Sequence, residues 1–311
     1  MRWTLKEVKD QESVNHLVQV LGIDPVLAQL LVDRGITTYE QAKSFFRPSL
    51  DELHDPYLMK DMDKAVKRIE EAIDRKENIM VFGDYDVDGT TAVALVYSYL
   101  QSYYPQVDRY IPDRYKEGYG VSYQGIDYAA DNDIKLIIAL DCGIKSVEHV
   151  EYAKQKGVDF VIGDHHLPGN KIPDAVAVLD PKRSDCSYPY DELCGCGVGF
   201  KLVQALAANR NQTIEDLMPY LDLVVTAIGA DIVPITGENR ILAYFGLEVL
   251  NSNPRPGIKA LLNLYKQSSY TVSDIVFKVA PKINAAGKNT TRQLCSRFTD
   301  AFLDERSRRN C

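Results

Sequence analysis

Three aspartates at alternate positions are the residues of this sequence best suited to chemistry. Asp84, Asp86 and Asp88 lie close together and are followed by Gly89. Carboxylates this close repel one another unless a cation lies between them. Hard divalent cations are the natural partners of such oxygens. The spacing therefore predicts a divalent-metal site.

The residues around these aspartates predict the elements that position them. Residues 79–82 (IMVF) form a short apolar run typical of a buried parallel strand. Gly89 predicts a tight turn, and Thr90 and Thr91 are expected to cap a helix. In an open parallel sheet, sites lie at the carboxyl ends of the strands. The apolar residues of the expected helix recur at helical spacing: Val93, Val96, Tyr97 and Leu100.

Two further apolar runs end in metal-binding residue types. Residues 136–140 end at Asp141, and residues 160–162 precede Gly163 and the triplet 164–166 (Asp-His-His). Helical patterns alternate with these runs, which predicts an α/β fold with a parallel sheet. The carboxyl ends of parallel strands share one edge, so the three groups are expected to converge. Strands are also expected at 107–111 and 177–179, and helices at 61–76, 122–132, 146–156, 199–208 and 214–228.

The adjacent histidines are expected to have different roles. If the backbone stays extended at His165 and His166, their side chains point in opposite directions. One would then bind metal and the other would face a substrate. Asp231, which follows the helix predicted at 214–228, is a further candidate ligand.

Other interpretations of these aspartates compete with the divalent-metal site. The Asp84–Gly89 run also opens a calcium EF-hand loop, but that loop requires Glu at its twelfth position, where this chain has Leu95, and a helix where this chain has a strand. A solvated acidic turn remains an alternative for the three aspartates. Asp141 alone is compatible with a helix cap or a turn.

Composition places limits on the class of protein. The chain has 311 residues, a net charge of −8 and six cysteines. The charge argues mildly against a large nucleic-acid surface but does not exclude a basic groove. The polar N-terminus shows no signal peptide, and no apolar run reaches membrane-spanning length. We expect a cytoplasmic protein with reduced cysteines. Cys186, Cys194 and Cys196 lack zinc-site spacing, which favours a packing role.

One stretch combines aromatic and basic side chains, a combination that suits single-stranded nucleic acid through stacking and phosphate contacts. The alternative is that a tyrosine-rich chain simply carries tyrosines in its loops. The residues concerned are Tyr103, Tyr104, Tyr110, Tyr115, Tyr119, Tyr123, Arg109, Arg114 and Lys116.

The motifs together resemble the DHH phosphoesterase superfamily, and within it the single-strand-specific DNA exonucleases. The resemblance begins with residues 84–89 (DYDVDG), 141–143 (DCG) and 164–166 (DHH). It covers roughly residues 15–288, and the ordered set is much more specific than DHH alone. The other matching motifs are at 111–114 (IPDR), 117–120 (EGYG), 195–200 (GCGVGF), 229–234 (GADIVP) and 280–287 (APKINAAG).

The resemblance implies 5′-to-3′ hydrolysis of single-stranded DNA in repair and recombination, with two Mn²⁺ or Mg²⁺ ions. It also implies a monomer that works with a single-strand-binding protein and a helicase. The implied metal ligands are Asp84, Asp86, Asp88, Asp141, His165 and Asp231. The implied catalytic residues are His166, which would face the scissile phosphate, Asp141 as the bridging ligand, and Asp164. The implied substrate-binding residues are Arg109, Arg114, Tyr119, Asn284 and Lys288.

The same resemblance implies three parts. Residues 1–60 would be a helical preface with helices at 25–34 and 38–46, residues 61–250 the DHH domain, and residues 251–311 a connecting helical segment. Lys288 stands where the family usually has Arg, and residues 289–311 no longer resemble it. We therefore expect a truncated or frameshifted, low-activity form without the second, DHH-associated domain.

Two other functions stay open at this stage. One is a phosphodiesterase acting on short oligonucleotides or cyclic dinucleotides. The other is a catalytically dead scaffold of DNA replication, although retention of every candidate ligand argues against it.

Overall fold

The computed structural model describes residues 10–289, with side chains described to residue 285. The chain divides after Leu53 into two compact units. The three-part division expected from the sequence is finer and stays a prediction.

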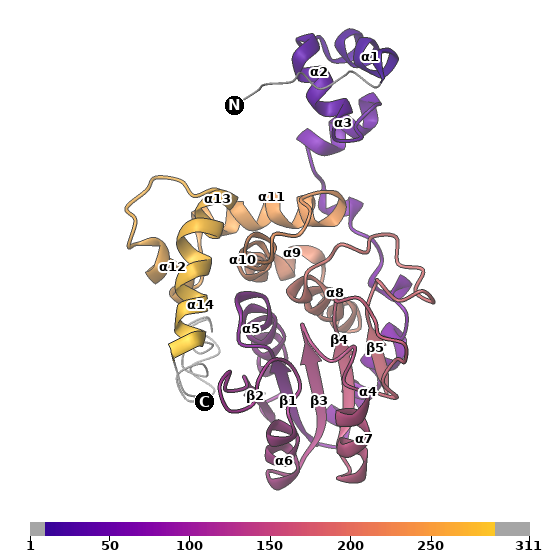
Figure 1. The fold of residues 1–311 in the computed structure, drawn as a ribbon, viewed down its shortest axis with the longest axis vertical. Helices are drawn as coiled ribbons and strands as arrows, with labels where there is room; N and C mark the ends of the chain where they lie inside the picture. Colours follow the sequence, from indigo (N-terminus) through magenta and orange to yellow (C-terminus); the bar gives the residue numbers. More distant parts are fainter. Residues whose placement is uncertain (1–9, 290–311) are drawn as a thin grey trace. The chain divides into compact units, whose positions relative to one another are not determined.

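The first unit is a small helical bundle. Its apolar core includes Leu17, Ala28 and Leu31. Asp10 and Asp24 cap the first two helices by accepting backbone N–H bonds, as short polar side chains do at helix starts. The first helix was not predicted, whereas the other two were. The elements are α1 (Gln11–Leu21), α2 (Pro25–Val32), α3 (Tyr39–Phe46) and the 3₁₀ turn η1 (Leu50–Glu52) (Figure 1).

The second unit is built on a parallel five-stranded sheet, as predicted. The strand order is β2-β1-β3-β4-β5, and every neighbouring pair is parallel. The strands β3 and β4 are rich in aliphatic residues and almost fully buried, as expected for a sheet covered on both faces, whereas β2 at the edge carries the half-buried Asp108 and Arg109. Their bounds are β1 (Asn78–Gly83), β2 (Val107–Tyr110), β3 (Ile134–Leu140), β4 (Asp159–Gly163) and β5 (Ala177–Leu179).

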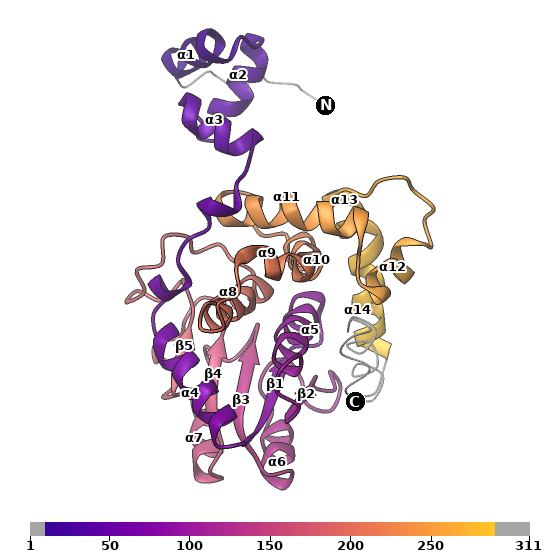
Figure 2. The same cartoon turned by 180° about the vertical axis from the view of Figure 1, so that it is seen from behind.

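Helices cover both faces of this sheet. Two of them, α6 and α7, contact β3 and β4 from one face, and α4, α5 and α8 lie on the other (Figures 1 and 2). The helices are α4 (Met62–Asp74), α5 (Val87–Gln101), α6 (Tyr123–Asp131), α7 (Val147–Gln155) and α8 (Gly195–Ala208), with a 3₁₀ turn η2 (Pro56–Leu58) before α4.

The helix predicted at 214–228 is wrong as a single element. Pro219 has no N–H to continue the helical hydrogen bonds, and the chain forms three pieces there. The last piece ends at Asp231 and packs against α5, α8 and α11. The elements that follow α8 are α9 (Ile214–Leu217), the 3₁₀ turn η3 (Met218–Tyr220), α10 (Leu221–Asp231), α11 (Gly237–Ser252), α12 (Pro256–Leu262), α13 (Val272–Asp274), the π-helical turn η4 (Ile275–Val279) and α14 (Ala280–Asn289).

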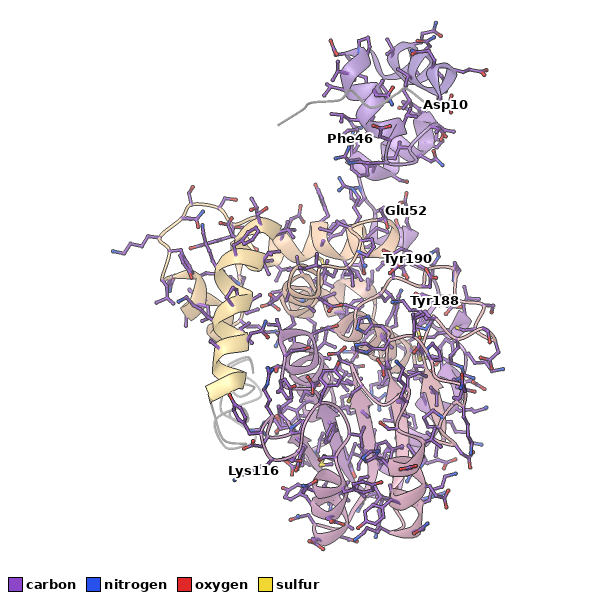
Figure 3. The ribbon with its side chains drawn as sticks, in the orientation of Figure 1. Asp10, Phe46, Glu52, Lys116, Tyr188 and Tyr190 are labelled. Carbon is purple, nitrogen blue, oxygen red and sulfur yellow. The ribbon has the colours of Figure 1, made fainter. Side chains whose placement is uncertain are left out.

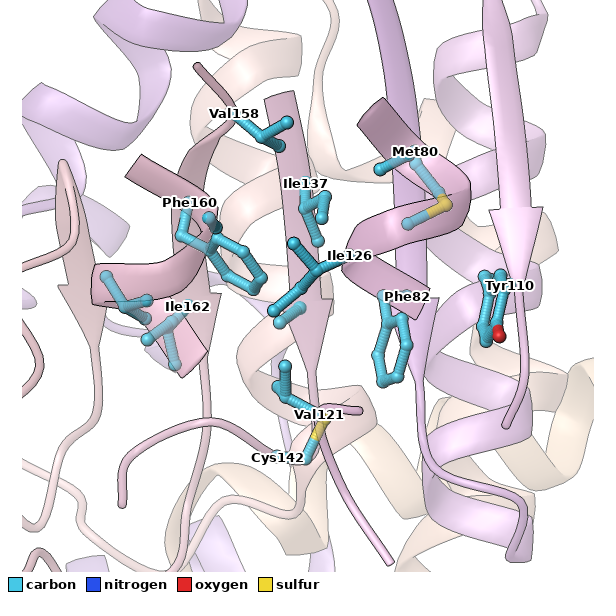
Figure 4. Packing of buried hydrophobic residues seen from close by; sticks show 14 of the residues in the cluster. Met80, Phe82, Tyr110, Val121, Ile126, Ile137, Cys142, Val158, Phe160 and Ile162 are labelled. Carbon is cyan, nitrogen blue, oxygen red and sulfur yellow. The ribbon is translucent and has the colours of Figure 1, made fainter. Parts of the chain in front are cut away.

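The core beneath α6 and α7 fixes the sheet that carries the strand ends. A long segment that bears Tyr188 and Tyr190 connects β5 with α8 (Figure 3). Within the core, Phe82 and Tyr110 stack with ring centroids 5.2 Å apart, and Ile126 and Phe160 pack in the same cluster (Figure 4).

Among residues 10–289, no helix is both long and apolar enough to cross a membrane.

Candidate metal centre

Two strand ends and one helix end bring acidic side chains around His165, which itself follows a third strand. Its Nε2 lies 3.1 Å from Asp141 Oδ1 and 3.7 Å from both Asp88 Oδ2 and Asp231 Oδ2. Asp88 follows β1, Asp141 follows β3, His165 follows β4, and Asp231 ends α10. The expected convergence at one sheet edge is therefore present. We define the carboxylate cluster as Asp84, Asp86, Asp88, Asp141 and Asp231 together with His165.

Asp141 is buried and follows β3 directly. Its backbone has φ of 59°, a left-handed conformation that Asp tolerates better than most residues and that turns the chain at the end of β3. Both of its carboxylate oxygens are buried and accept no hydrogen bond within the described part of the chain. Gly195 makes room for it, because a Cβ there would lie 2.5 Å from Asp141 Cβ.

The turn after β1 differs from the prediction. Gly89 does not form a loop, and Thr90 and Thr91 do not cap the helix. The helix α5 begins earlier, at Val87, and Asp86 caps it by accepting the Gly89 N–H at 3.0 Å. Gly89 is needed for a different reason: a Cβ there would lie 2.6 Å from Asp84 N. The early start places Asp88 in the first turn of α5.

The start of α8 also differs from the prediction and contributes to the site. This helix begins at Gly195, four residues before the predicted Gly199. Asp88 accepts the backbone N–H of Gly195 at 2.6 Å and that of Cys196 at 2.7 Å. The partial positive charge of a helix N-terminus thus stabilises Asp88 inside the cluster. Sequence reasoning missed this role, although the glycines at 195–199 (GCGVG) mark a close backbone approach.

Crowding of buried carboxylates raises their pKa values. Burial, followed by repulsion from Asp86, raises the pKa of Asp84 to about 7 and that of Asp231 to about 6. Burial and the charges of Asp231 and Asp86 raise the pKa of Asp88 to about 7. Burial also raises the pKa of Asp141. Protein groups alone therefore leave this negative charge uncompensated.

The donor set fits hard or borderline divalent cations. Two sets of three residues could each hold an ion, because within each set the ligand atoms lie within 4.8 Å of one another. One set is Asp141, His165 and His166, and the other is Asp88, His165 and Asp231. One oxygen of Asp84 is also buried and accepts no hydrogen bond from described residues. Carboxylate oxygens with one or two imidazoles suit Mn²⁺ or Mg²⁺ better than a soft metal.

The two histidines do not point in opposite directions, as extended backbone would have required. The strand β4 ends at Gly163, and the two ring centroids lie only 4.5 Å apart. They differ in exposure instead, with side-chain exposures of 7% for His165 and 42% for His166. Burial and the neighbouring His166 lower the pKa of His165 to about 4, which keeps its ring neutral and able to bind a metal.

Asp164 orients His166. Its Oδ1 lies 2.7 Å from His166 Nδ1, and its Oδ2 accepts the Ile144 N–H at 2.9 Å. Although burial opposes it, the bond from His166 keeps the pKa of Asp164 below its ordinary value. The same bond raises the pKa of His166. The pair is a candidate proton-handling unit beside the carboxylate cluster.

An aromatic rim, which consists of Tyr85 and Tyr119 together with Arg114, lies beside the histidines. Tyr119 Oη is 3.4 Å from His166 Nε2, and its ring meets Tyr85 edge-on with centroids 6.1 Å apart. The guanidinium of Arg114 lies 5.1 Å from the centroid of the Tyr85 ring. Two predicted substrate-binding residues, Arg114 and Tyr119, thus belong to one surface with the cluster. Tyr85 was missed, although it stands between two of the aspartates.

The other predicted substrate-binding residues are placed differently. Arg109 donates to the Tyr97 hydroxyl at 3.0 Å and lies over the Tyr97 ring, so its guanidinium packs against α5. Asn284 is half-buried on α14. The side chain of Lys288 lies outside the described residues, as does the predicted departure from the family after it. Cys194 and Cys196 are free and buried, as the packing interpretation predicted, whereas Cys186 is half-buried.

Part of the chain matches a known family. Residues 78–228 match the DHH family, N-terminal domain. The chain is similar to the single-stranded-DNA-specific exonuclease RecJ of Bacillus subtilis (strain 168), with 40% identity over 290 residues, 93% of this chain and 36% of that protein. RecJ of Escherichia coli (strain K12) is 34% identical over 280 residues, 86% of this chain and 48% of that protein. The chain thus spans between about a third and a half of these relatives.

Solved structures share the fold of this chain. A crystal structure of exonuclease RecJ bound to manganese is 28% identical, with a TM-score of 0.72 over 84% of this chain and 67% of that one. RecJ from Thermus thermophilus in complex with Mn²⁺ has a TM-score of 0.81 and covers 99% of this chain and 44% of that one. At 24% identity, the second similarity shows the fold alone.

Proposed function

We propose that this chain hydrolyses phosphodiester bonds of single-stranded DNA, from the 5′ end, with two Mn²⁺ or Mg²⁺ ions. The observation that carries the proposal is the buried Asp141 carboxylate, whose oxygens accept no hydrogen bond from the described residues and lie beside His165. The similarity to RecJ exonucleases supports the choice of substrate.

Six residues would hold the cations: Asp84, Asp86, Asp88, Asp141, His165 and Asp231. When bound, such ions activate water and neutralise the attacking and leaving oxygens of the phosphodiester. Asp141 would be the bridging ligand in this proposal, because its Oδ1 lies 3.1 Å from Nε2 of His165, the residue that both ligand sets share. Asp88 keeps its position because the N-terminus of α8 holds both of its oxygens.

His166 faces the scissile phosphate in this proposal. Its Nδ1 is committed to Asp164, which leaves Nε2 directed toward Tyr119 and the exposed side of the cluster. A protonated ring donates a hydrogen bond to a phosphate oxygen or a proton to the leaving oxygen. The raised pKa of His166, caused first by its bond to Asp164, favours the protonated form.

The aromatic rim binds the strand being degraded. Tyr85 and Tyr119 present rings on which bases stack, and Arg114 carries a charge for a phosphate. Asn284 and Lys288 on α14 and Arg109 on β2 would also contact the DNA. A single-strand-binding protein and a helicase are the proposed partners of a monomer.

The test uses a 5′-labelled and a 3′-labelled single strand with Mn²⁺. The expected result is early release of a labelled mononucleotide from the 5′ end, with no attack on a blunt duplex. The matched control is Asp141→Asn, which keeps the side-chain size. Hydrolysis of dinucleotides or cyclic dinucleotides alone would replace the proposal with the short-substrate alternative. Metal binding without any hydrolysis would favour a scaffold.

A further inference from the structure

The chain that follows Asp231 leaves α10 in a strained conformation. Asp231 is the last residue of this helix, and its side chain is 34% exposed. The next residue, Ile232, has φ of 58°, a left-handed conformation that β-branched side chains rarely adopt. Such a conformation costs free energy and persists only where the surrounding structure holds it. Contacts of the loop after Asp231 must therefore hold the backbone in place.

Two side chains hold this loop at the carbonyl of Pro234. The Asn239 Nδ2 donates to that oxygen at 3.0 Å, and the Tyr190 hydroxyl donates to it at 3.2 Å. A carbonyl oxygen has two lone pairs and accepts both bonds. Tyr190 also packs against the backbone at Gly237, where an added Cβ would lie 2.7 Å from its ring. Asn239 and Tyr190 together thus fix the path of the loop between Asp231 and α11.

The same Asn239 amide holds the chain that leads to α8. Its Nδ2 also donates to the Glu192 carbonyl at 2.6 Å. Glu192 lies three residues before Gly195, whose N–H donates to Asp88 at 2.6 Å. The loop carbonyl that accepts the other bond lies three residues after Asp231. One amide therefore joins the two stretches of chain that position Asp88 and Asp231.

The acceptor of this amide has no partner. Asn239 is fully buried, and its Oδ1 accepts no hydrogen bond from the described residues. The orientation of the amide is determined, because only its nitrogen can donate to two carbonyls. A buried acceptor without a hydrogen bond is unfavourable. The contribution of asparagine at this position therefore comes from the two bonds that it donates.

We propose that Asn239, which was not among the predicted site residues, is a positioning residue of the metal centre. It sets the spacing of Asp88 and Asp231 around His165. Both carboxylates have an oxygen 3.7 Å from His165 Nε2, and the three residues form one ligand set. This inference rests on the proposed two-metal hydrolysis of phosphodiesters. Residues that hold metal ligands in place commonly change metal affinity or activity about tenfold to a hundredfold.

A purely structural role predicts a different result. Asn239 follows Glu238, which pairs with the buried Lys201, so it could serve only to anchor the start of α11. Its loss would then lower stability and leave Mn²⁺ binding by the folded molecules unchanged. If Asn239 positions the ligands, Mn²⁺ affinity falls in molecules that remain folded.

The experiment compares Asn239→Leu and Tyr190→Phe with the unaltered chain, and Asn251→Leu is the matched control. Leucine has a similar size to asparagine but no donor, and Tyr190→Phe removes only the hydroxyl. Asn251 lies twelve residues further along α11, about 18 Å away along the helix axis. Its Nδ2 also donates to two carbonyls, at 2.8 and 2.9 Å. Calorimetry measures Mn²⁺ binding, circular dichroism and urea unfolding measure folding, and kcat is measured on a single-stranded oligonucleotide.

Asn239→Leu should weaken the binding of one of the two Mn²⁺ ions about tenfold to a hundredfold and lower kcat. Tyr190→Phe should have a smaller effect in the same direction, because Asn239 still holds the loop carbonyl. Asn251→Leu should change neither Mn²⁺ binding nor kcat.

Unchanged Mn²⁺ binding by folded Asn239→Leu, or an equal loss in Asn251→Leu, would overturn the inference. If Asn239→Leu does not fold, Tyr190→Phe decides, and unchanged Mn²⁺ binding by that variant overturns the inference. If the unaltered chain binds Mn²⁺ without hydrolysing DNA, the proposed function fails, and the Mn²⁺ comparison still tests Asn239. If the unaltered chain binds no Mn²⁺, the inference fails together with the metal centre.

Discussion

Two clusters of buried charge in the second unit are organised in opposite ways. In one, Lys201 Nζ lies 2.6 Å from Glu238 Oε1, and the other Glu238 oxygen accepts the Tyr188 hydroxyl at 2.6 Å. The backbone N–H of His54 completes the set at 2.9 Å. In the carboxylate cluster, by contrast, the Asp141 oxygens accept no hydrogen bond from the described residues.

This difference separates a structural charge cluster from a functional one. Glu238 is neutralised within the protein, so the cluster around it needs nothing from outside. The carboxylate cluster has five acids and one neutral imidazole, a combination that is unfavourable without a cation. Both clusters contain buried charged residues, and the number of internal partners tells them apart.

The largest effect is expected for Asp141→Asn. This substitution should abolish detectable hydrolysis, because the bridging ligand is lost. The metal-free variant should be at least as stable as the unaltered chain, because one repelling charge has been removed. Nuclease assays and thermal unfolding without metal measure the two effects. A marked loss of metal-free stability would place Asp141 with the structural cluster.

His166→Ala separates the proposed phosphate contact of His166 from the proposed metal binding of His165. Turnover should fall by about 10²–10⁴-fold, the usual range for a general acid or base. Mn²⁺ affinity should stay near normal, whereas His165→Ala should lose it. Calorimetry and steady-state kinetics on the same two variants provide the test. Equal losses of Mn²⁺ binding would make both histidines ligands, in line with the grouping of His166 with Asp141.

Glu238→Ala should lower stability and spare metal binding, the opposite of the result expected for Asp141→Asn. It leaves Lys201 buried and unpaired, which costs about 3–5 kcal/mol of unfolding free energy. Mn²⁺ binding per folded molecule should be retained. Urea unfolding monitored by circular dichroism measures the cost, with Glu248→Ala, an exposed glutamate on the same helix α11, as control. If stability is unchanged, the Lys201–Glu238 pair is not the structural counterpart described above.

The pH dependence of metal-free stability sharpens the comparison further. Asp84, Asp88 and Asp231 have pKa values of about 7, 7 and 6 against 3.8 when unfolded. Between about pH 4 and pH 7 the folded chain therefore holds protons that the unfolded chain releases, so stability falls as pH rises. The pKa of His165 is lowered to about 4, which makes stability rise with pH in this range, but this is one group against three carboxyl groups.

Mn²⁺ should remove most of that fall, because the ions replace the protons. Thermal unfolding at several pH values, with and without Mn²⁺, measures it. Metal-free stability that increases steadily up to pH 7 would contradict the description of the carboxylate cluster as uncompensated.

The smallest expected effect concerns Arg114. Arg114→Ala should reduce the slope of the logarithm of DNA affinity against the logarithm of salt concentration by about one, as for one lost phosphate contact. Fluorescence anisotropy at several salt concentrations measures it. An unchanged slope would mean that Arg114 serves only to pack on Tyr85.

The sequence was sufficient for the sheet and for most of the cluster. Apolar runs ending in acids or histidines predict parallel strand ends, and these share an edge for reasons of chain geometry alone. Asp88, Asp141, His165 and Asp231 accordingly converge.

What the sequence could not supply depends on tertiary contacts. The early start of α8 is visible only once Asp88 is in place to accept its first N–H groups. The orientation of the two histidines depends on where β4 stops and on the hold of Asp164. The position of Arg109 on Tyr97 follows from the packing of β2 beside α5.

The most direct test of the central claim is a calorimetric titration of the chain with Mn²⁺ at pH 7.5, repeated with Asp141→Asn. We predict two bound ions for the unaltered chain and fewer, or much weaker, binding for the variant, with both proteins folded by circular dichroism. Absence of binding to the unaltered chain, or identical binding by the two proteins, would contradict the claim that the carboxylate cluster is a metal centre.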